Sequence, residues 1–172
     1  MIKLAQPSDL AAVMLFYDQL ITDLATTEFP SDWHKGVYPD STYVQEAIAR
    51  GELFINWCEQ QIISAMVLNG VANEGYAQAP WQVADDGSNI LLIHTLGVAA
   101  AVQGQKIAQT MVRFAIKQAR QQHKAALHLD AVATNIPAQK LYAASGFTHV
   151  VTLKLFYADT GVTDFLLYEL VL

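Results

Sequence analysis

The pattern of apolar and polar positions divides the chain into short strands and amphipathic helices. Apolar runs that are continuous or alternate with polar residues, and that end at turn residues, predict strands. The predicted strands cover residues 1–5, 53–58, 62–68, 90–98, 126–132, 148–157 and 163–171. Apolar residues at spacings of three and four predict helices. The predicted helices cover residues 10–21, 41–50, 106–121 and the stretch from Asn135 to just before Gly146.

The order of these elements predicts an α/β fold. A strand, a long helix and a second strand follow one another between residues 90 and 132, and a crossover of that length joins parallel strands. The last two predicted strands are separated only by a short turn at 159–161 and predict an antiparallel hairpin. We therefore expect one domain, residues 1–172, with a central mixed sheet and helices on both faces.

Local signals mark some boundaries of these elements. In the helix at 41–50, Thr42 is a candidate N-cap and Gly51 a candidate stop. Gly97 lies inside a predicted strand, where a glycine marks a bulge or the close approach of another backbone or a ligand. Relief of side-chain packing accounts for Gly97 equally well, so both interpretations stay open.

Two segments show neither the strand pattern nor the helix pattern of apolar residues. Residues 26–41 contain several aromatic rings, Trp33 and Tyr38 among them, and from the residues alone these rings close one end of the core. Residues 71–89 are polar and rich in turn residues, yet Trp81 within them is apolar. We interpret this second segment as a surface excursion rather than a linker.

Composition and charge exclude several classes of protein. With 53% hydrophobic and 15% charged residues, the chain is not a disordered one, and a net charge of −6 disfavours nucleic-acid binding. No apolar run is long and continuous enough to span a membrane, and no export signal opens the sequence. The lone cysteine, Cys58, allows no internal disulfide and favours the cytoplasm, while the scattered histidines predict no metal site.

The candidate chemistry lies between residues 98 and 147. A glycine-containing turn, residues 103–108, precedes the longest predicted helix, whose first amides and dipole attract an anion. It is not a Walker loop, because no Gly-Lys-Ser/Thr follows, and it is not a dinucleotide fingerprint, because only Gly104 is glycine. A second motif, N-x-x-A-x-x-L-Y-x-x-x-G-F, follows downstream. Its residues are Asn135, Ala138, Leu141, Tyr142, Gly146 and Phe147.

These two motifs, in this order, resemble those of the GNAT N-acetyltransferase family. The family's pyrophosphate loop has Gln or Arg, two residues, Gly, one residue, then Gly or Ala; Gln103 and Ala108 match its ends, and Lys106 replaces the usual glycine. The resemblance implies the family's fold, in which the sheet splays at the cofactor site, and acetyl-CoA as the cofactor. It implies contacts of the cofactor with Leu96, Gly97, Val98, Gln103, Gly104, Gln105, Lys106, Ile107, Ala108, Asn135, Ala138 and Tyr142.

The same resemblance implies catalytic roles. Tyr142 matches the tyrosine beside the cofactor sulfur, and a phenol of pKa about 10 can give a proton to a departing thiolate. Backbone N–H groups near Val98 would stabilise the oxyanion. His94 is a candidate base because an ordinary histidine pKa suits the task, although a lone histidine in an apolar strand is more often a hydrogen-bonded core residue. Glu74 and Asp130 are weaker candidates.

The resemblance also places the acceptor pocket. Its walls come from the region around Trp33 and Tyr38 and from residues 71–89. We therefore predict transfer of an acetyl group from acetyl-CoA to a primary amine of a small molecule or peptide. A non-catalytic acyl-CoA-binding or sensing module would need neither Tyr142 nor a base, and a structural α/β domain would bind nothing. The identity of the amine and formation of a homodimer are left open.

Overall fold

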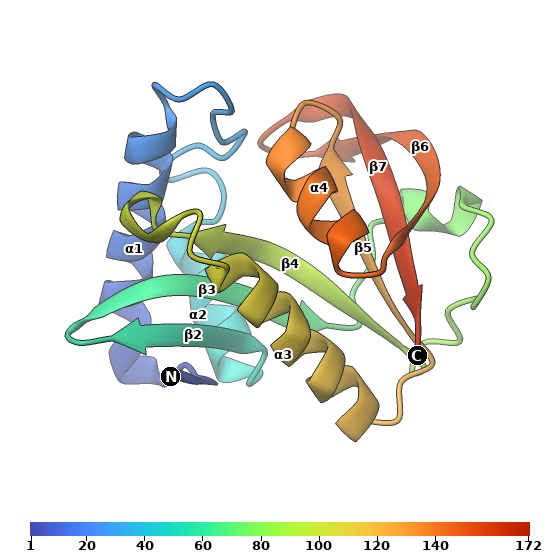
Figure 1. Cartoon of the computed structure of the whole chain (residues 1–172), viewed down its shortest axis with the longest axis horizontal. Helices are drawn as coiled ribbons and strands as arrows, with labels where there is room; N and C mark the ends of the chain where they lie inside the picture. The colour runs from blue at the N-terminus through green and yellow to red at the C-terminus, as the bar shows by residue number, and fades with distance from the viewer.

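The computed structural model describes all residues, 1–172, and contains the predicted alternation of strands and helices (Figure 1). The strands are β1 (Ile2–Leu4), β2 (Leu53–Cys58), β3 (Gln61–Asn69), β4 (Ile90–Val98), β5 (Ala126–Val132), β6 (Thr148–Tyr157) and β7 (Gly161–Val171). The α-helices are α1 (Leu10–Leu24), α2 (Ser41–Ala49), α3 (Ile107–Gln121) and α4 (Ile136–Ala144), with short 3-10 turns η1 (Pro7–Asp9), η2 (Glu74–Gln78) and η3 (Ala100–Val102). No helix combines the length and the apolar character that a membrane crossing needs.

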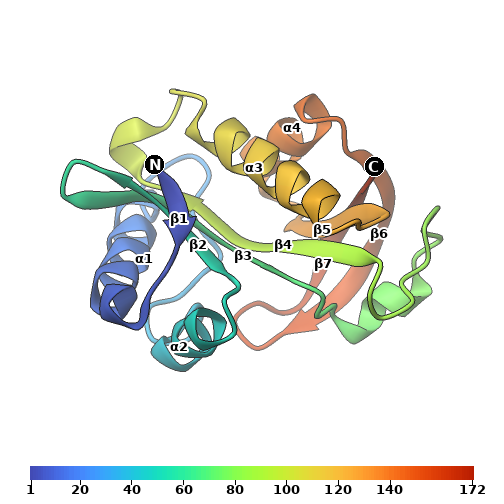
Figure 2. The ribbon, with the colours of Figure 1, turned by 90° about the horizontal axis from the view of Figure 1, so that it is seen from below.

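The seven strands form one mixed sheet in the order β1-β2-β3-β4-β5-β7-β6. Only the pair β4–β5 is parallel, which is the pair that the α3 crossover joins. α1 and α2 cover one face of the sheet, and α3 and α4 cover the other (Figure 2). Each face has its own apolar cluster, with Val13 and Leu20 of α1 in one and Met111 and Val112 of α3 in the other. The predicted fold class is confirmed.

The two central strands separate partway along their length. β4 and β5 pair only from Ile90 to Leu92, opposite Ala126 to His128, and then diverge (Figure 1). Beyond Leu92, the edge of β4 that faces β5 therefore has no strand partner. This divergence opens the middle of the sheet without any insertion in the sequence.

A bulge in β4 lies just beyond this point. His94 pairs with Val67 and Gly97 pairs with Ala65, so Thr95 and Leu96 both lie opposite one residue of β3. Thr95 takes the positive φ angle, 49°, that such an extra residue requires. Gly97 itself packs closely against α1, because an added Cβ would lie 2.7 Å from Leu20 Cδ2. The structure therefore supports both interpretations of Gly97, because a bulge lies directly before it and the residue itself packs against α1.

Two helix caps follow from local chemistry. The N-cap of α2 is Asp40, whose side chain accepts a hydrogen bond from Tyr43 N at 2.8 Å. The expected cap, Thr42, was wrong because it already lies inside the first helical turn. In α4, Asn135 is the N-cap, and its side chain accepts a hydrogen bond from Ala138 N at 3.1 Å. Asn135 therefore fixes the direction in which α4 leaves β5.

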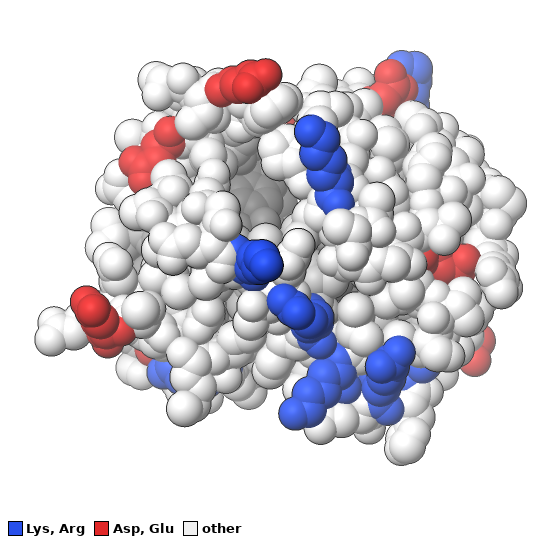
Figure 3. Space-filling model, in the orientation of Figure 1, with Lys and Arg blue, Asp and Glu red and all other residues white.

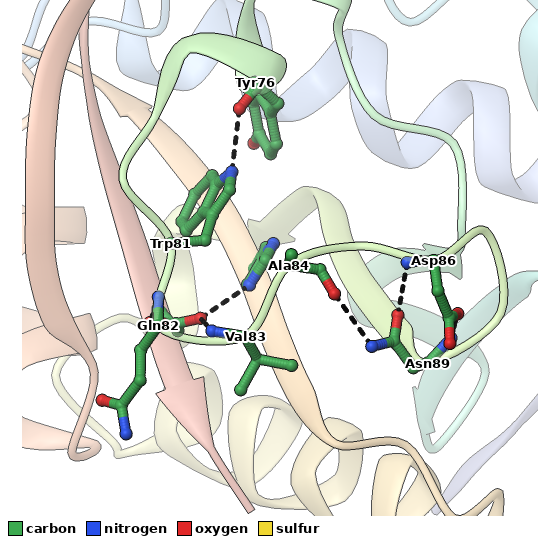
Figure 4. A network of polar contacts seen from close by, with 9 residues as sticks. Tyr76, Trp81, Gln82, Val83, Ala84, Asp86 and Asn89 are labelled. Atoms are coloured by element: carbon green, nitrogen blue, oxygen red, sulfur yellow. Dashed lines mark hydrogen bonds and ion pairs between the residues drawn. The ribbon is translucent and has the colours of Figure 1, made fainter.

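The surface excursion at residues 70–89 is held to the sheet by a buried carboxylate (Figure 4). Glu169 of β7 accepts hydrogen bonds from Gln82 N at 3.0 Å and Val83 N at 2.9 Å. The same carboxylate lies 3.0 Å from His128 Nε2 of β5. Trp81 stacks on the His128 ring with centroids 3.8 Å apart. These contacts tie the excursion to the β5–β7 side of the sheet.

Candidate active site

A cavity of about 660 Å³ lies where β4 and β5 diverge. Its lining comes from α1, the segment between α1 and α2, the second half of β4, the start of α3, the end of β5, α4 and the β6–β7 turn. Figure 3 shows the hollow between the regions of α1 and α4, with Lys and Arg side chains along the exposed face of α3 beside it. The splayed sheet thus brings distant parts of the chain around one space.

The start of α3 presents free backbone donors to this cavity. The first main-chain hydrogen bond of the helix runs from Thr110 N to Lys106 O at 3.0 Å, and no side chain caps the helix. The N–H groups of Ile107, Ala108 and Gln109 are therefore unpaired, and all three residues line the cavity. Unpaired amides at the positive end of a helix dipole form an anion site.

Lys106 adopts the conformation that explains the family's usual glycine at this position. Its φ of 63° and ψ of 16° lie in the left-handed region, which glycine enters without strain. Its side chain is exposed. The loop therefore keeps the shape that a glycine would give it, at a cost of roughly 1–2 kcal/mol in backbone strain.

Most of the predicted cofactor residues lie together around the cavity. Gln103 Nε2 donates to Val98 O at 3.2 Å and so ties the loop to the end of β4. Gln105 is the exception: it is not part of the lining, and its N–H donates to Val102 O at 3.4 Å. The predicted residues that do line the cavity are Leu96, Gly97, Val98, Gln103, Gly104, Lys106, Ile107, Ala108, Asn135, Ala138 and Tyr142.

Tyr142 lies on α4 with its ring in the core and against the cavity. The residue is 6% exposed, and its ring packs on Phe147 and Tyr168 with centroids 5.7 and 5.9 Å apart. Burial raises the pKa of the Tyr142 phenol well above its usual range, and the charge of Asp130 adds to this effect. The phenol therefore keeps its proton at neutral pH and is available as a hydrogen-bond donor.

His94 lines the cavity, but its pKa does not suit a general base. Burial lowers the pKa of the imidazole to about 4, so the expectation of an ordinary histidine pKa was wrong. Nε2 of His94 is buried and has no hydrogen-bond partner. At neutral pH the His94 ring is uncharged, and its Nε2 can form a hydrogen bond with a ligand. Glu74, a weaker candidate, belongs to η2 and lies outside the lining.

Three aspartates line the cavity. Asp130 accepts hydrogen bonds from the hydroxyls of Tyr76, at 3.0 Å, and Tyr157, and burial raises the pKa of its carboxyl group. Asp32 and Asp159 come from two loops, and the pKa of Asp32 is raised first by burial and then by the charge of Asp159. Sequence reasoning missed Asp32 and Asp159, because a single aspartate in a loop carries no local signal.

Of the two segments that were expected to wall the acceptor pocket, one lines the cavity and the other does not. Trp33 and Tyr38 line the cavity, but no residue of the 71–89 excursion does. The excursion is held on the β5–β7 side by Glu169. In its place Asp159 and Thr160, from the turn between β6 and β7, complete the lining.

Comparisons with known proteins agree with this geometry. Residues 19–147 match the model of the acetyltransferase (GNAT) family. No curated protein matches the chain. Several solved structures share its fold. A GNAT-family acetyltransferase from Streptococcus agalactiae has 19% identity and a TM-score of 0.81, with 100% of this chain and 95% of that chain covered.

Two further structures share the fold at lower identity. A ribosomal-protein-alanine N-acetyltransferase from Brucella melitensis has 17% identity and a TM-score of 0.72, covering 100% of this chain and 99% of that chain. A Salmonella typhimurium protein solved with its cofactor acetyl-CoA has 15% identity and a TM-score of 0.70, covering 99% of this chain and 92% of that chain.

Proposed function

Because the chain belongs to the GNAT acetyltransferase family, which uses acetyl-CoA as acyl donor, we propose that it transfers the acetyl group to a primary amine by direct attack. One observation carries the proposal. A single cavity joins the unpaired amides at the start of α3, the phenol of Tyr142 and the carboxylates of the acceptor side. If the diphosphate of acetyl-CoA binds at the first of these features, the pantetheine arm would carry the thioester toward the second, with room beside it for an amine.

The start of α3 and the divergent strands are suited to hold the donor. The N–H groups of Ile107, Ala108 and Gln109 would bind the diphosphate, with the helix dipole favouring its negative charge. The unpartnered edge of β4 beyond Leu92 offers backbone groups to the pantetheine arm in the gap before β5. Asn135 uses its side-chain oxygen for the α4 cap, which leaves its amide nitrogen free to donate to the same arm.

Tyr142 would act on the leaving sulfur. Acetyl-CoA supplies an activated acyl group whose leaving thiol has a pKa of about 8.5. The phenol of Tyr142, with a pKa raised by burial, is protonated before reaction and can donate a hydrogen bond to the sulfur as negative charge develops on it. Backbone N–H groups near Val98 would stabilise the oxyanion that develops at the carbonyl.

Asp130 fits the role of proton acceptor better than His94. An alkylammonium has a pKa of about 10.4, so roughly one molecule in a thousand is neutral at pH 7. Transfer of its proton to His94, whose pKa is about 4, would be uphill by roughly 9 kcal/mol. Burial raises the pKa of the Asp130 carboxyl group above its usual value, and the residue lines the cavity. Asp130 would accept the proton directly or through a water molecule.

The test is release of coenzyme A from acetyl-CoA with a panel of small amines, peptides and aminoglycosides. We expect turnover with at least one amine, and a loss of about a hundredfold or more in kcat for Tyr142→Phe with the dissociation constant of acetyl-CoA unchanged. Tyr168→Phe is the matched control, because this ring touches Tyr142 but does not line the cavity. Binding of acetyl-CoA without turnover of any amine would indicate a sensing module instead.

A second variant tests the anion site separately. Ala108→Glu places a carboxylate beside the free amides of α3, and we expect the affinity for acetyl-CoA to fall by about a hundredfold, measured by calorimetry. Gln121→Glu adds the same charge at the other end of the helix and should leave the affinity unchanged. If acetyl-CoA gives no thermal stabilisation of the unaltered protein at saturating concentration, the donor site does not exist.

A further inference from the structure

The acceptor side of the cavity has an excess of negative charge. Its lining includes Glu28, Asp32, Asp130 and Asp159. The one Lys or Arg in the lining is Lys106, which belongs to the loop that begins α3. None of the four carboxylates takes part in an ion pair. A cationic ligand would offset this uncompensated charge.

Two of these carboxylates are brought together by separate loops. Asp32 lies between α1 and α2, and Asp159 lies in the turn between β6 and β7. They are close enough for the charge of Asp159 to raise the pKa of Asp32, while the imidazole of His34 acts in the opposite direction. Like charges held together in a partly buried place are unfavourable unless a cation lies between them. Residues of both loops line the cavity.

Aromatic rings surround the same space. A cation is attracted to the face of an aromatic ring, and the attraction grows when both are removed from water. Carboxylates and aromatic rings together are therefore the surroundings that an alkylammonium group prefers. The rings in the lining on this side are Phe29, Trp33, Tyr38, Tyr157 and Phe165.

Two polar atoms in the lining lack partners, which is an independent sign of a polar ligand. His94 Nε2 and Thr95 Oγ1 are both buried without a hydrogen bond, and Thr95 as a whole is 7% exposed. Buried polar atoms are costly when they are left unpaired. An amine nitrogen entering the cavity can supply the missing hydrogen bond to His94, whose ring is neutral at pH 7.

We propose that the acceptor is a small aliphatic amine with at least two cationic nitrogens. One nitrogen lies toward His94 and Tyr142 and is acetylated, and the other is held between Asp32 and Asp159 among the aromatic rings. This assignment rests on the proposed function and specifies its acceptor. In the reaction the carbon–sulfur bond of the thioester breaks and a carbon–nitrogen bond forms. The ammonium loses two protons, of which one ends on the thiol sulfur and one passes through Asp130 to solvent.

The experiment compares straight-chain diamines with monoamines of the same length. Butanediamine and hexanediamine are measured against butylamine and hexylamine by coenzyme A release at saturating acetyl-CoA. We expect kcat/KM to be at least about tenfold higher for the better diamine. Asp32→Asn and Asp159→Asn should each raise the KM for that diamine by about tenfold, which corresponds to about 1.4 kcal/mol, and leave the KM for the monoamine unchanged. Asp164→Asn, on the exposed face of β7, is the control and should change neither value.

Other results overturn the assignment. Equal kcat/KM for diamines and monoamines, equal changes of both KM values in the two variants, or a preference for peptides without basic side chains would each contradict it. Calorimetric titration of the diamine into the complex with coenzyme A separates this inference from the proposed function. Binding that depends on Asp32 and Asp159, without turnover, would support the cation site and refute the catalytic proposal. Absence of diamine binding would refute the cation site, whichever amine is turned over.

Discussion

The two long irregular segments of this molecule look alike in sequence and differ in what they do. Residues 26–40 and residues 70–89 both contain proline and large aromatic residues. The first segment lines the cavity from Thr27 to Trp33 and again at Tyr38, whereas the second lines none of it. Aromatic content therefore does not show which irregular segment belongs to a site.

The two segments differ in how their polar groups are paired. In the second segment the backbone N–H groups of Gln82 and Val83 are satisfied by Glu169, and Asn89 closes a turn by donating to Ala84 O at 2.9 Å (Figure 4). The first segment is held mainly by ring packing, such as that of Trp33 on Tyr17 with centroids 5.7 Å apart. Its Asp32 has no ion-pair partner. We infer that the segment held by Glu169 is structural, and that the segment whose Asp32 lines the cavity without an ion-pair partner is open to a ligand.

The largest effect that this comparison predicts is on stability, at Glu169. Glu169→Ala leaves two backbone N–H groups of the excursion and His128 without an acceptor, and should lower the free energy of unfolding by about 3 kcal/mol. Urea denaturation measures the loss. The dissociation constant of acetyl-CoA for the folded protein should not change. Glu169→Gln keeps an acceptor oxygen and the shape of the side chain. An equal loss of stability in both variants would therefore contradict the role of Glu169 as the hydrogen-bond acceptor that holds the excursion.

The second prediction concerns His94, which lies between the two regions because it lines the cavity and interacts with the backbone of Val71. Burial lowers its pKa from 6.5 to about 4. The unfolded chain therefore binds a proton more tightly, so the stability present above pH 6.5 is lost as the pH falls and is gone below about 4. The loss is about 3 kcal/mol, and burial of His128, whose pKa is also lowered, adds in the same direction.

The measurement is urea denaturation of the protein and of His94→Gln between neutral and acid pH. The variant should lose clearly less stability on acidification than the unaltered protein, because its side chain does not titrate. If the free energies of unfolding of both proteins fall in parallel with pH, protonation of His94 is not the cause of the acid destabilisation.

The fold and the loop that begins α3 could be predicted because their signals are local. The strand at 90–98 follows from an apolar run, and the Asn135 cap follows from a side chain next to the helix that it caps. The motif around residues 103–108 describes a backbone shape, and the left-handed Lys106 shows that this shape persists without glycine. Such features depend on residues that are close in sequence, so a sequence pattern can predict them.

The acceptor side could not be predicted because its parts meet only in the folded sheet. Asp32 and Asp159 lie at opposite ends of the chain, and each belongs to a loop with no periodicity. Likewise, nothing near residue 82 indicates that Glu169 will satisfy its backbone. Resemblance to the family suggested that residues 71–89 wall the pocket, but the contact with Glu169 holds them elsewhere.

A smaller effect on stability, joined to an effect on activity, is expected at Trp33. Trp33→Ala removes a half-buried ring that packs on Tyr17, and should lower the free energy of unfolding by about 2 kcal/mol. Because the ring lines the acceptor side, the KM for the amine should rise severalfold, while the dissociation constant of acetyl-CoA stays the same. Steady-state kinetics with one amine and calorimetry with acetyl-CoA distinguish the two. A change in acetyl-CoA affinity alone would show that the segment serves the donor.

The smallest effect is expected at Trp81, the matching aromatic residue of the excursion. Trp81→Phe keeps a ring to stack on His128 but loses the hydrogen bond from Nε1 to Tyr76 O at 2.8 Å, so the free energy of unfolding should fall by about 1 kcal/mol. Trp81→Leu also loses the stacking on His128 and should lower the free energy of unfolding more than Trp81→Phe does. Neither change should alter the KM for the amine, because Trp81 is outside the cavity. A rise in KM as large as that of Trp33→Ala would mean that the excursion also serves the acceptor, and the contrast between the two segments would fail.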